Sequence, residues 1–411
     1  MSARSAVSAA AVLLASAAAA APAAAQISDG VVKIGVLTDM SGVYARLTGE
    51  GSVVATKMAV EDCLKAECAG MKIEVISADH QNKADVAAAI ARRWIDEEKV
   101  DAFGDLVNAS VQLAVQAIVK DRDRVALYPG GTTRLTNEDC APENSVQWMW
   151  DTYSQVAAVV KPLAKPGSKW FFLTADYAFG AALQNDATAI VTRQGGTVVG
   201  SARHPLGAND FSSFILQAQG SDADFIGLAN AGGDTINAVK QASEFGVLGG
   251  GGASAKQKVV GFVMMLPEVE SIGLKLAQGA TLAEGFYWDL DDETRAWSKQ
   301  FEAAYGKGKP TMIQAGAYSA TLHYLKAVAA AKTDSAKAVV RKMHELPIKD
   351  AIVRNARLRE DGRMVHDFYL MRVKAPAESK GPDDIYDLVA TIKGDDAFKP
   401  LSESACPAVR K

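Results

Sequence analysis

Two positions in the first third of the chain place a polar side chain at the end of an apolar run. Tyr44 follows Ser41 and Gly42 behind the run VVKIGVLTDM, so its ring and hydroxyl can contact a ligand, although ordinary turn chemistry also accounts for this loop. Asn108 stands where a helix is expected to begin. It either caps that helix or stands beside free backbone N–H groups that attract an anion, and both interpretations stay open.

A third loop, YPGGTT, follows the run at 125–128 and ends in Gly131, Thr132 and Thr133. Glycine lets a backbone come close to a bound group, and the two threonines add hydroxyl donors. Together with the loop at Asn108, this loop predicts a cradle for a carboxylate.

The second half of the chain repeats the arrangement with more apolar residues. Tyr177 and Phe179 follow the run KWFFLTAD at 169–176, and Asn230 ends the run ADFIGLAN at 223–230. Met264 lies near the end of KVVGFVMM at 258–265. Core packing is the alternative for Phe179, but an aromatic residue beside a glycine at a strand end favours a ligand pocket.

The composition and motifs argue against several other functions. A net charge of −4 gives no basic field for nucleic acid. The five histidines are scattered and no CxxC motif occurs, so we predict neither a metal site nor a cofactor. No GxSxG or HExxH motif is present, and the pair Asp291-Asp292 lies in a charged, surface-like segment, so we expect no enzyme.

Residues 1–25 have the pattern of a cleavable signal peptide: an early cation, an alanine- and leucine-rich core, and a small-residue end. No cysteine follows the cleavage point, so we expect a soluble periplasmic protein. The four cysteines form an even number in a chain sent to an oxidising compartment, where thiols tend to pair. We favour the pairs Cys63–Cys68 and Cys140–Cys406.

Strand-like runs alternate with helix-like segments twice along the chain, which predicts parallel strands joined by crossover helices. Roughly 385 residues remain after cleavage, enough for two domains. We therefore predict an α/β fold with two doubly wound, Rossmann-like lobes joined by a multi-strand hinge. The expected boundaries are 27–150 plus 284–350 for lobe 1 and 151–283 plus 351–411 for lobe 2.

Ligands of such sheets bind beyond the carboxyl ends of the strands, where the loops above lie. Aromatic residues also gather at the two expected crossings between lobes. Trp148, Trp150 and Tyr153 mark the first crossing, and hinge packing explains them at least as well as ligand stacking does.

In their order along the mature chain, these loops resemble those of the type I periplasmic solute-binding proteins of ABC importers, specifically the leucine/isoleucine/valine-binding family. The resemblance implies a monomer that delivers a ligand to a membrane permease. It also implies that the ligand carboxylate is held by Tyr44, Asn108, Gly131 and Thr132 or Thr133. Tyr177 or Phe179 would then cover the ligand from lobe 2.

One departure from this family concerns the ligand. Members that bind amino acids place an acidic residue after the last strand of lobe 2 to neutralise the ammonium group, and residues 261–265 here read GFVMM. A buried ammonium group without a partner is costly. Asp176 or Asp234 can substitute, which keeps a branched-chain amino acid open. The segments ADYAFG and LANAGGDT resemble the branch that binds aromatic acids, so we rank an aromatic or other organic acid first. A sensory receptor with the same fold is a further alternative.

Overall fold

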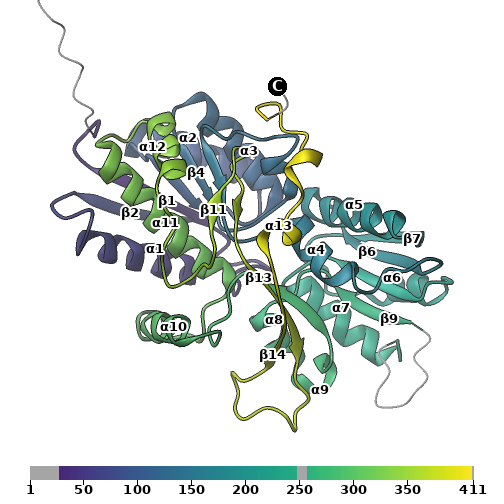
Figure 1. Ribbon diagram of the computed structural model, residues 1–411. Coiled ribbons are helices and arrows are strands. Elements are labelled where there is room, and N and C mark those ends of the chain that lie inside the picture. Colours follow the sequence, from purple (N-terminus) through teal and green to yellow (C-terminus); the bar gives the residue numbers. More distant parts are fainter. Residues whose placement is uncertain (1–26, 248–256, 410–411) are drawn as a thin grey trace, which may run out of the picture.

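The computed structural model describes residues 27–247 and 257–409 (Figure 1). The expected signal peptide, residues 1–25, lies outside these ranges. Within them, no helix is long and apolar enough to cross a membrane.

The first sheet contains five parallel strands in the order β2-β1-β3-β4-β5. Its central strands are continuous apolar runs because helices cover both faces. The strands are β1 (Val32–Thr38), β2 (Ile73–Asp79), β3 (Ala102–Asp105), β4 (Val125–Tyr128) and β5 (Ser145–Gln147). The helices around them are α1 (Gly49–Leu64), α2 (Ala84–Arg93), α3 (Ala109–Asp121), α11 (Met312–Ala331) and α12 (Ala336–Glu345), with a short π-helix at Trp94–Glu98.

Helix α11 comes from much later in the chain than the sheet it packs on. It is buried along most of its length, in keeping with its mostly small and apolar residues. Helix α10 (Asp292–Tyr305) precedes it and packs beside α1. We call the part built on the first sheet lobe 1, and it therefore contains two distant segments of the sequence.

The second sheet contains four parallel strands in the order β7-β6-β8-β9, and we call the part built on it lobe 2. The strands are β6 (Lys169–Ala175), β7 (Thr197–His204), β8 (Phe225–Ala229) and β9 (Lys258–Gly261). The helices are α4 (Thr152–Val160), α5 (Ala178–Arg193), α6 (Ser212–Gln219), α7 (Gly233–Glu244), α8 (Leu266–Ile272) and α9 (Leu274–Ala277). The predicted pair of doubly wound sheets is thus confirmed. Their expected boundaries stay a prediction.

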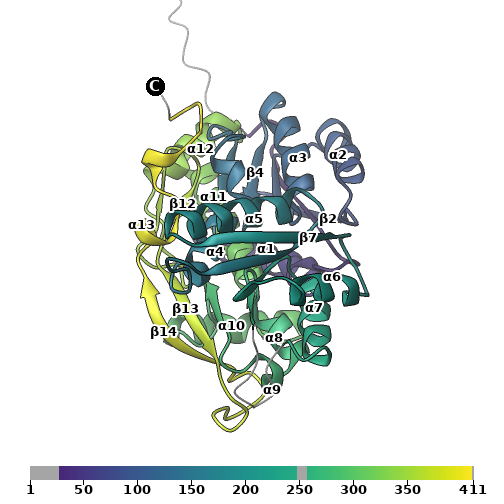
Figure 2. The same cartoon turned by 90° about the vertical axis from the view of Figure 1, so that its right-hand side faces the viewer.

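The C-terminal part of the chain forms antiparallel structure that the sequence had not suggested. The strands β10 (Thr281–Glu284), β13 (Phe368–Val373) and β14 (Tyr386–Ile392) form one sheet, and β11 (Arg357–Leu358) pairs with β12 (Met364–Val365). Figure 2 shows β12, β13, β14 and α13 (Gly394–Ala397) along one edge of the molecule, and both α13 and β10 contact α4. Short 3-10 helices occur at Thr133–Thr136 and Leu401–Glu403.

One local expectation needs correction. The strand expected at 258–265 ends at Gly261, because Met265 and Glu268 form a capping box that starts α8. Both expected disulfides are confirmed, Cys63–Cys68 and Cys140–Cys406, with Cα atoms 5.0 and 5.5 Å apart.

Candidate functional site

A narrow cavity with about 20 Å³ of free volume lies between the carboxyl ends of the two parallel sheets. Its lining is mostly apolar and aromatic, and no Asp, Glu, Lys, Arg or His occurs among these described residues. Lobe 1 and α11 contribute Tyr44, Leu47, Val107, Asn108, Ala109, Gly131, Trp150 and Ile313. Lobe 2 contributes Tyr177, Phe179, Ala231, Val263 and Met265.

Tyr44 is placed in the cavity by a buried carboxylate. Asp39 directly follows β1 and accepts hydrogen bonds from the backbone N–H groups of Gly42 (2.7 Å) and Tyr44 (2.9 Å). The side chain of Asn82 donates a further bond to Asp39 at 2.6 Å. These bonds fix the loop after β1, so Tyr44 is held at 3% exposure with its ring on the cavity.

Asn108 combines the two roles that the sequence left open. Its side chain accepts from the N–H groups of Ser110 (3.0 Å) and Val111 (3.2 Å), so it caps α3. Its φ of 114° lies in a region that non-glycine residues rarely adopt, which is a feature of ligand sites. The next residue, Ala109, lines the cavity, and its backbone N–H has no partner among the described residues. A free N–H at a helix N-terminus favours an anion.

Gly131 and Trp150 form the adjoining wall. Gly131 has a φ of 150°, and a Cβ atom there would lie 2.1 Å from the side-chain oxygen of Gln112. Gln112 in turn donates to the carbonyl of Gly130 at 2.5 Å, which holds this loop. The backbone N–H of Gly131 and the indole N–H of Trp150 have no partner among the described residues, and Trp150 is 3% exposed. Two more unused donors therefore belong to the cavity lining.

Lobe 2 closes the cavity with two aromatic rings at the start of α5. Tyr177 and Phe179 have ring centroids 6.0 Å apart, and Phe179 meets Trp150 edge-on at 6.1 Å. The hydroxyl of Tyr177 bonds to the hydroxyl of Tyr44 at 2.5 Å, a polar contact across the cavity. Burial and the Tyr177 hydroxyl hold the pKa of Tyr44 well above its ordinary value, so both phenols stay neutral.

A buried carboxylate behind this wall joins the other two loops of lobe 2. Glu268 accepts from the backbone N–H groups of Gly232 (2.9 Å) and Met265 (3.3 Å) and is 1% exposed. It thereby holds Ala231 and Met265 against the cavity without lining the cavity itself. Burial raises the pKa of Glu268 to about 7. The sequence pattern missed this residue because it lies seven positions beyond the end of β9.

Thr132 and Thr133, expected in the carboxylate cradle, do not line the cavity. Thr132 is fully buried and its hydroxyl accepts from the N–H of Arg134 at 3.3 Å. The Thr133 hydroxyl bonds to Thr152 at 2.8 Å and donates to Asp186 of α5 at 3.2 Å. Thr132 caps the 3-10 helix Thr133–Thr136, and the turn into this helix carries both side chains away from the cavity.

Asn230 and Met264 also lie outside the lining. The Asn230 amide contacts the His204 ring at 3.0 Å and accepts from the Thr235 hydroxyl at 2.8 Å. Met264 packs into the core of lobe 2, and its neighbours Val263 and Met265 line the cavity instead. Because β9 ends early, the alternation of side chains no longer follows the strand pattern at Met264.

The two acidic residues proposed as partners of an ammonium group lie elsewhere. Asp176 forms an exposed ion pair with Arg203 at 2.9 Å. Asp234 is buried, accepts from the N–H of Gly207 at 3.2 Å and lies 4.0 Å from His204. Burial raises the pKa of Asp234 to about 6. Neither belongs to the cavity lining.

Several lining residues carry no signal in the sequence. Leu47 and Ile313 are apolar residues in segments far apart along the chain, and the packing of α11 against α1 brings them together. Trp150 was assigned to hinge packing or to ligand stacking, and the structure places it in the cavity wall.

The sequence profile described as "Periplasmic binding protein" matches residues 31–382, which is most of the chain. This match covers both sheets and every loop of the cavity. The chain belongs to the periplasmic binding protein family. The resemblance inferred from the strand-end loops is thereby confirmed.

Solved structures of periplasmic binding proteins agree with this assignment. One from Burkholderia mallei is 42% identical with a TM-score of 0.87, and the match covers 92% of this chain and 99% of that one. A protein from Burkholderia xenovorans, described as a branched chain amino acid ABC transporter ligand-binding protein, is also 42% identical. Its TM-score is 0.79, with 92% of this chain and 100% of that chain covered. No curated protein sequence matches significantly.

A solute-binding protein from R. palustris, solved in complex with benzoate, shares the fold. It is 20% identical with a TM-score of 0.77, and the match covers 92% of this chain and 100% of that one.

Proposed function

We propose that this protein is the periplasmic receptor of an ABC importer and that it binds a small organic carboxylate, with an aromatic acid as the favoured ligand. The proposal rests on one observation: the cavity offers unused N–H donors and aromatic walls but no charged side chain. The cavity has about 20 Å³ of free volume in this conformation, so the lobes would have to separate to admit a single-ring molecule.

The carboxylate meets the free N–H groups of Ala109 and Gly131 and the indole N–H of Trp150. Hydrogen bonds from neutral donors to an anion are stronger than bonds between neutral groups, and the N-terminus of α3 adds a favourable dipole. The ring then lies among Phe179, Tyr177 and the aliphatic residues of the lining. Aromatic groups pack well in such a setting because they prefer offset or edge-on contacts.

The same lining disfavours an α-amino acid. Its ammonium group would lose water without gaining a carboxylate partner, because Glu268 is engaged by two backbone N–H groups and lies behind the wall. The second candidate is nevertheless a branched-chain amino acid, which the description of the B. xenovorans relative supports. For that ligand, Glu268 would have to turn toward the cavity.

Titration calorimetry of the mature protein with benzoate, 4-hydroxybenzoate, leucine, isoleucine and valine distinguishes the two candidates. We expect binding of at least one aromatic carboxylate and little heat from the amino acids. Benzamide is the matched control, because it keeps the ring and removes the negative charge. Strong binding of leucine with no response to the aromatic acids would overturn our ranking. Recovery of the ligand unchanged after incubation separates a receptor from an enzyme.

Closure of lobe 2 over the bound ligand would present the closed form to the permease. A micromolar dissociation constant corresponds to about 8 kcal/mol, from which the free energy of closing is already subtracted. Small-angle scattering with and without ligand measures this closure, and monomer mass in the same experiment tests the expected oligomeric state.

A further inference from the structure

The C-terminal tail, residues 393–409, runs from α13, which contacts α4 of lobe 2, toward lobe 1 (Figure 1). Its end is bonded to lobe 1, because Cys406 forms a disulfide with Cys140. Its middle contacts lobe 2, where Glu403 pairs with Arg193 of α5 at 3.2 Å. The tail therefore links the lobes, with the disulfide and an Ala405–Asn137 hydrogen bond on lobe 1, and the exposed ion pair and a Lys161–Asp396 hydrogen bond on lobe 2.

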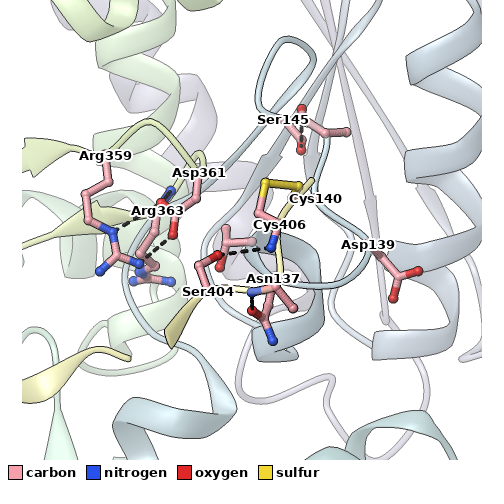
Figure 3. Close-up of a disulfide and its surroundings, with 12 residues drawn as sticks. Asn137, Asp139, Cys140, Ser145, Arg359, Asp361, Arg363, Ser404 and Cys406 are labelled. Carbon is pink, nitrogen blue, oxygen red and sulfur yellow. Dashed lines mark hydrogen bonds and ion pairs between the residues drawn. A yellow bond between two sulfur atoms is a disulfide. The ribbon is translucent and has the colours of Figure 1, made fainter. Parts of the chain in front are cut away.

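Arg363 is a fully buried cation close to this tail (Figure 3). Its guanidinium donates to the carbonyl oxygens of Trp148 (2.8 Å) and Trp150 (3.0 Å), and its Nε donates to the carbonyl of Met364 (3.0 Å). The carboxylate of Asp151, the residue that caps α4, lies 3.7 Å away. A planar guanidinium can hold several acceptors at fixed angles, so Arg363 fixes the segment that passes from lobe 1 into lobe 2.

The tail covers Arg363 and is fastened next to it. The ring of Phe398 lies 4.1 Å from the Arg363 guanidinium carbon, a cation–π contact. Arg359 donates to the carbonyl of Lys399 at 2.8 Å, and it also pairs with Asp361. If the tail were released, Arg363 would lose its aromatic cover and meet water.

Arg363 is connected to the cavity through one residue. Trp150 offers its carbonyl oxygen to Arg363 and its indole ring to the cavity wall. The indole lies directly against the backbone of Gly130, where a Cβ atom would come within 2.0 Å of its nitrogen. In so tight a site, a small shift of the Trp150 backbone moves the indole N–H relative to the ligand.

We propose that Arg363 is a positioning residue for ligand binding and that the disulfide-anchored tail holds it in place, so that affinity depends on the Cys140–Cys406 bond. The part of this inference that concerns ligand affinity rests on the proposed function. The effect on the position of Trp150 precedes ligand binding and can be measured without a ligand.

The test uses two double variants of the mature protein. Cys140→Ser with Cys406→Ser releases the tail, and Cys63→Ser with Cys68→Ser removes the other disulfide as the matched control. The indole ¹H–¹⁵N resonance of Trp150 is assigned from its loss in Trp150→Phe. We expect this resonance to shift in the first variant and not in the control. The first variant should also bind benzoate about tenfold more weakly, the scale of coupling between linked sites, while the control stays within about twofold of wild type.

Phe398→Leu provides a second variant that keeps both disulfides and removes only the aromatic cover. It should shift the same resonance and weaken binding in the same direction, which keeps the proposal testable if the serine variant fails to fold. An unchanged resonance in the folded variants overturns the proposal, and so does a shifted resonance with unchanged affinity. If wild type binds none of the acids or amino acids tested, the proposed function fails. The indole resonance of Trp150 then still tests whether Arg363 and the tail fix the position of Trp150.

Discussion

The two sides of the cavity are built from different chemical groups. Lobe 1 contributes the unused N–H donors of Ala109, Gly131 and Trp150, whereas lobe 2 contributes the rings of Tyr177 and Phe179 with aliphatic neighbours. For the proposed carboxylate ligand, recognition of the charged group would thus be separated from the exclusion of water. Lobe 1 would engage the carboxylate while the lobes are open, and closure of lobe 2 would strengthen each of those bonds by removing competing water.

The rigidity of the two sides also differs in origin. In lobe 1, side chains bond to the backbone of the loops around the cavity, as Asp39 does at Tyr44 and Gln112 does at Gly130. In lobe 2, one buried carboxylate, Glu268, holds two loops at once. A donor must be placed within a few tenths of an ångström, while an apolar wall tolerates more variation, so the difference matches the roles of the lobes.

The largest effect is expected where a donor loop is disturbed. Gly131→Ala strains a φ of 150° and drives a Cβ atom into Gln112. Losing well-placed donors to an anion costs about 2–3 kcal/mol, or about 30- to 150-fold in affinity. Calorimetry with the best aromatic acid measures this loss.

Gly232→Ala is the matched variant on lobe 2. Its Cβ atom would come within 2.4 Å of the Val43 carbonyl oxygen, so it obstructs closure and leaves the donors intact. We expect about tenfold weaker binding together with a scattering profile that stays open in the presence of ligand. If Gly232→Ala weakened binding more than Gly131→Ala, the division of roles between the lobes would be wrong.

A smaller effect is expected at the aromatic wall. Phe179→Leu keeps an apolar side chain and removes the edge-on contact with Trp150. An aromatic pair contributes about 0.5–1.5 kcal/mol beyond its buried area, so affinity for a ring-bearing acid should fall about two- to twelvefold. Acetate is the control ligand, since it has the carboxylate without the ring, and its weak binding should not respond to this substitution.

Much of the fold could be predicted because periodicity is a local property of the sequence. The strand β1 and the loop to Tyr44 are contiguous, so the position of Tyr44 followed from the apolar run alone. The disulfides followed from the number of cysteines and the export signal. By contrast, Thr132 and Thr133 were misplaced because a 3-10 helix, stabilised by contacts with Thr152 and Asp186, turns them away from the cavity.

The other differences between the expected site and the cavity lining have a similar cause. Met264 was expected in the site because its run of apolar residues continues past Gly261, but the capping box of α8 ends the strand there. Ile313 and Trp150 could not be assigned because their place depends on helix packing and on a hinge built from the far end of the chain. Contacts between segments that are distant in sequence leave no local pattern.

The hydroxyl pair that joins the lobes in the cavity should contribute less than the aromatic wall. Tyr177→Phe and Tyr44→Phe each remove the bond between these hydroxyls. A neutral hydrogen bond contributes about 0.5–1.5 kcal/mol net, so we expect a two- to tenfold loss, nearer the lower figure because the partner hydroxyl can turn to the ligand. Equal losses in the two variants would show that the pair acts as a unit. A much larger loss for Tyr44→Phe would make its hydroxyl a direct donor to the carboxylate.

The smallest effect on affinity is expected for an interlobe contact outside the cavity. Asp186 of α5 accepts from the hydroxyls of Thr152 (2.7 Å) and Thr133 (3.2 Å), with Asp151 and Lys399 as the charged groups nearby. Burial raises the pKa of Asp186 to about 7. Because this pKa exceeds the unfolded value of about 3.9, the folded protein binds the proton more tightly, and stability falls as pH rises from about 4 to 7.

Asp186→Asn should abolish this loss of folding stability at higher pH, because a neutral amide oxygen can still accept both hydroxyl hydrogen bonds. We expect thermal unfolding of the variant to match wild type at pH 4 and to occur at higher temperature at pH 8, with ligand affinity within about twofold throughout. A lower melting temperature at pH 8 would mean that Asp186 is charged and stabilising. An affinity change beyond this range would instead extend the binding site from the cavity to this contact between the lobes.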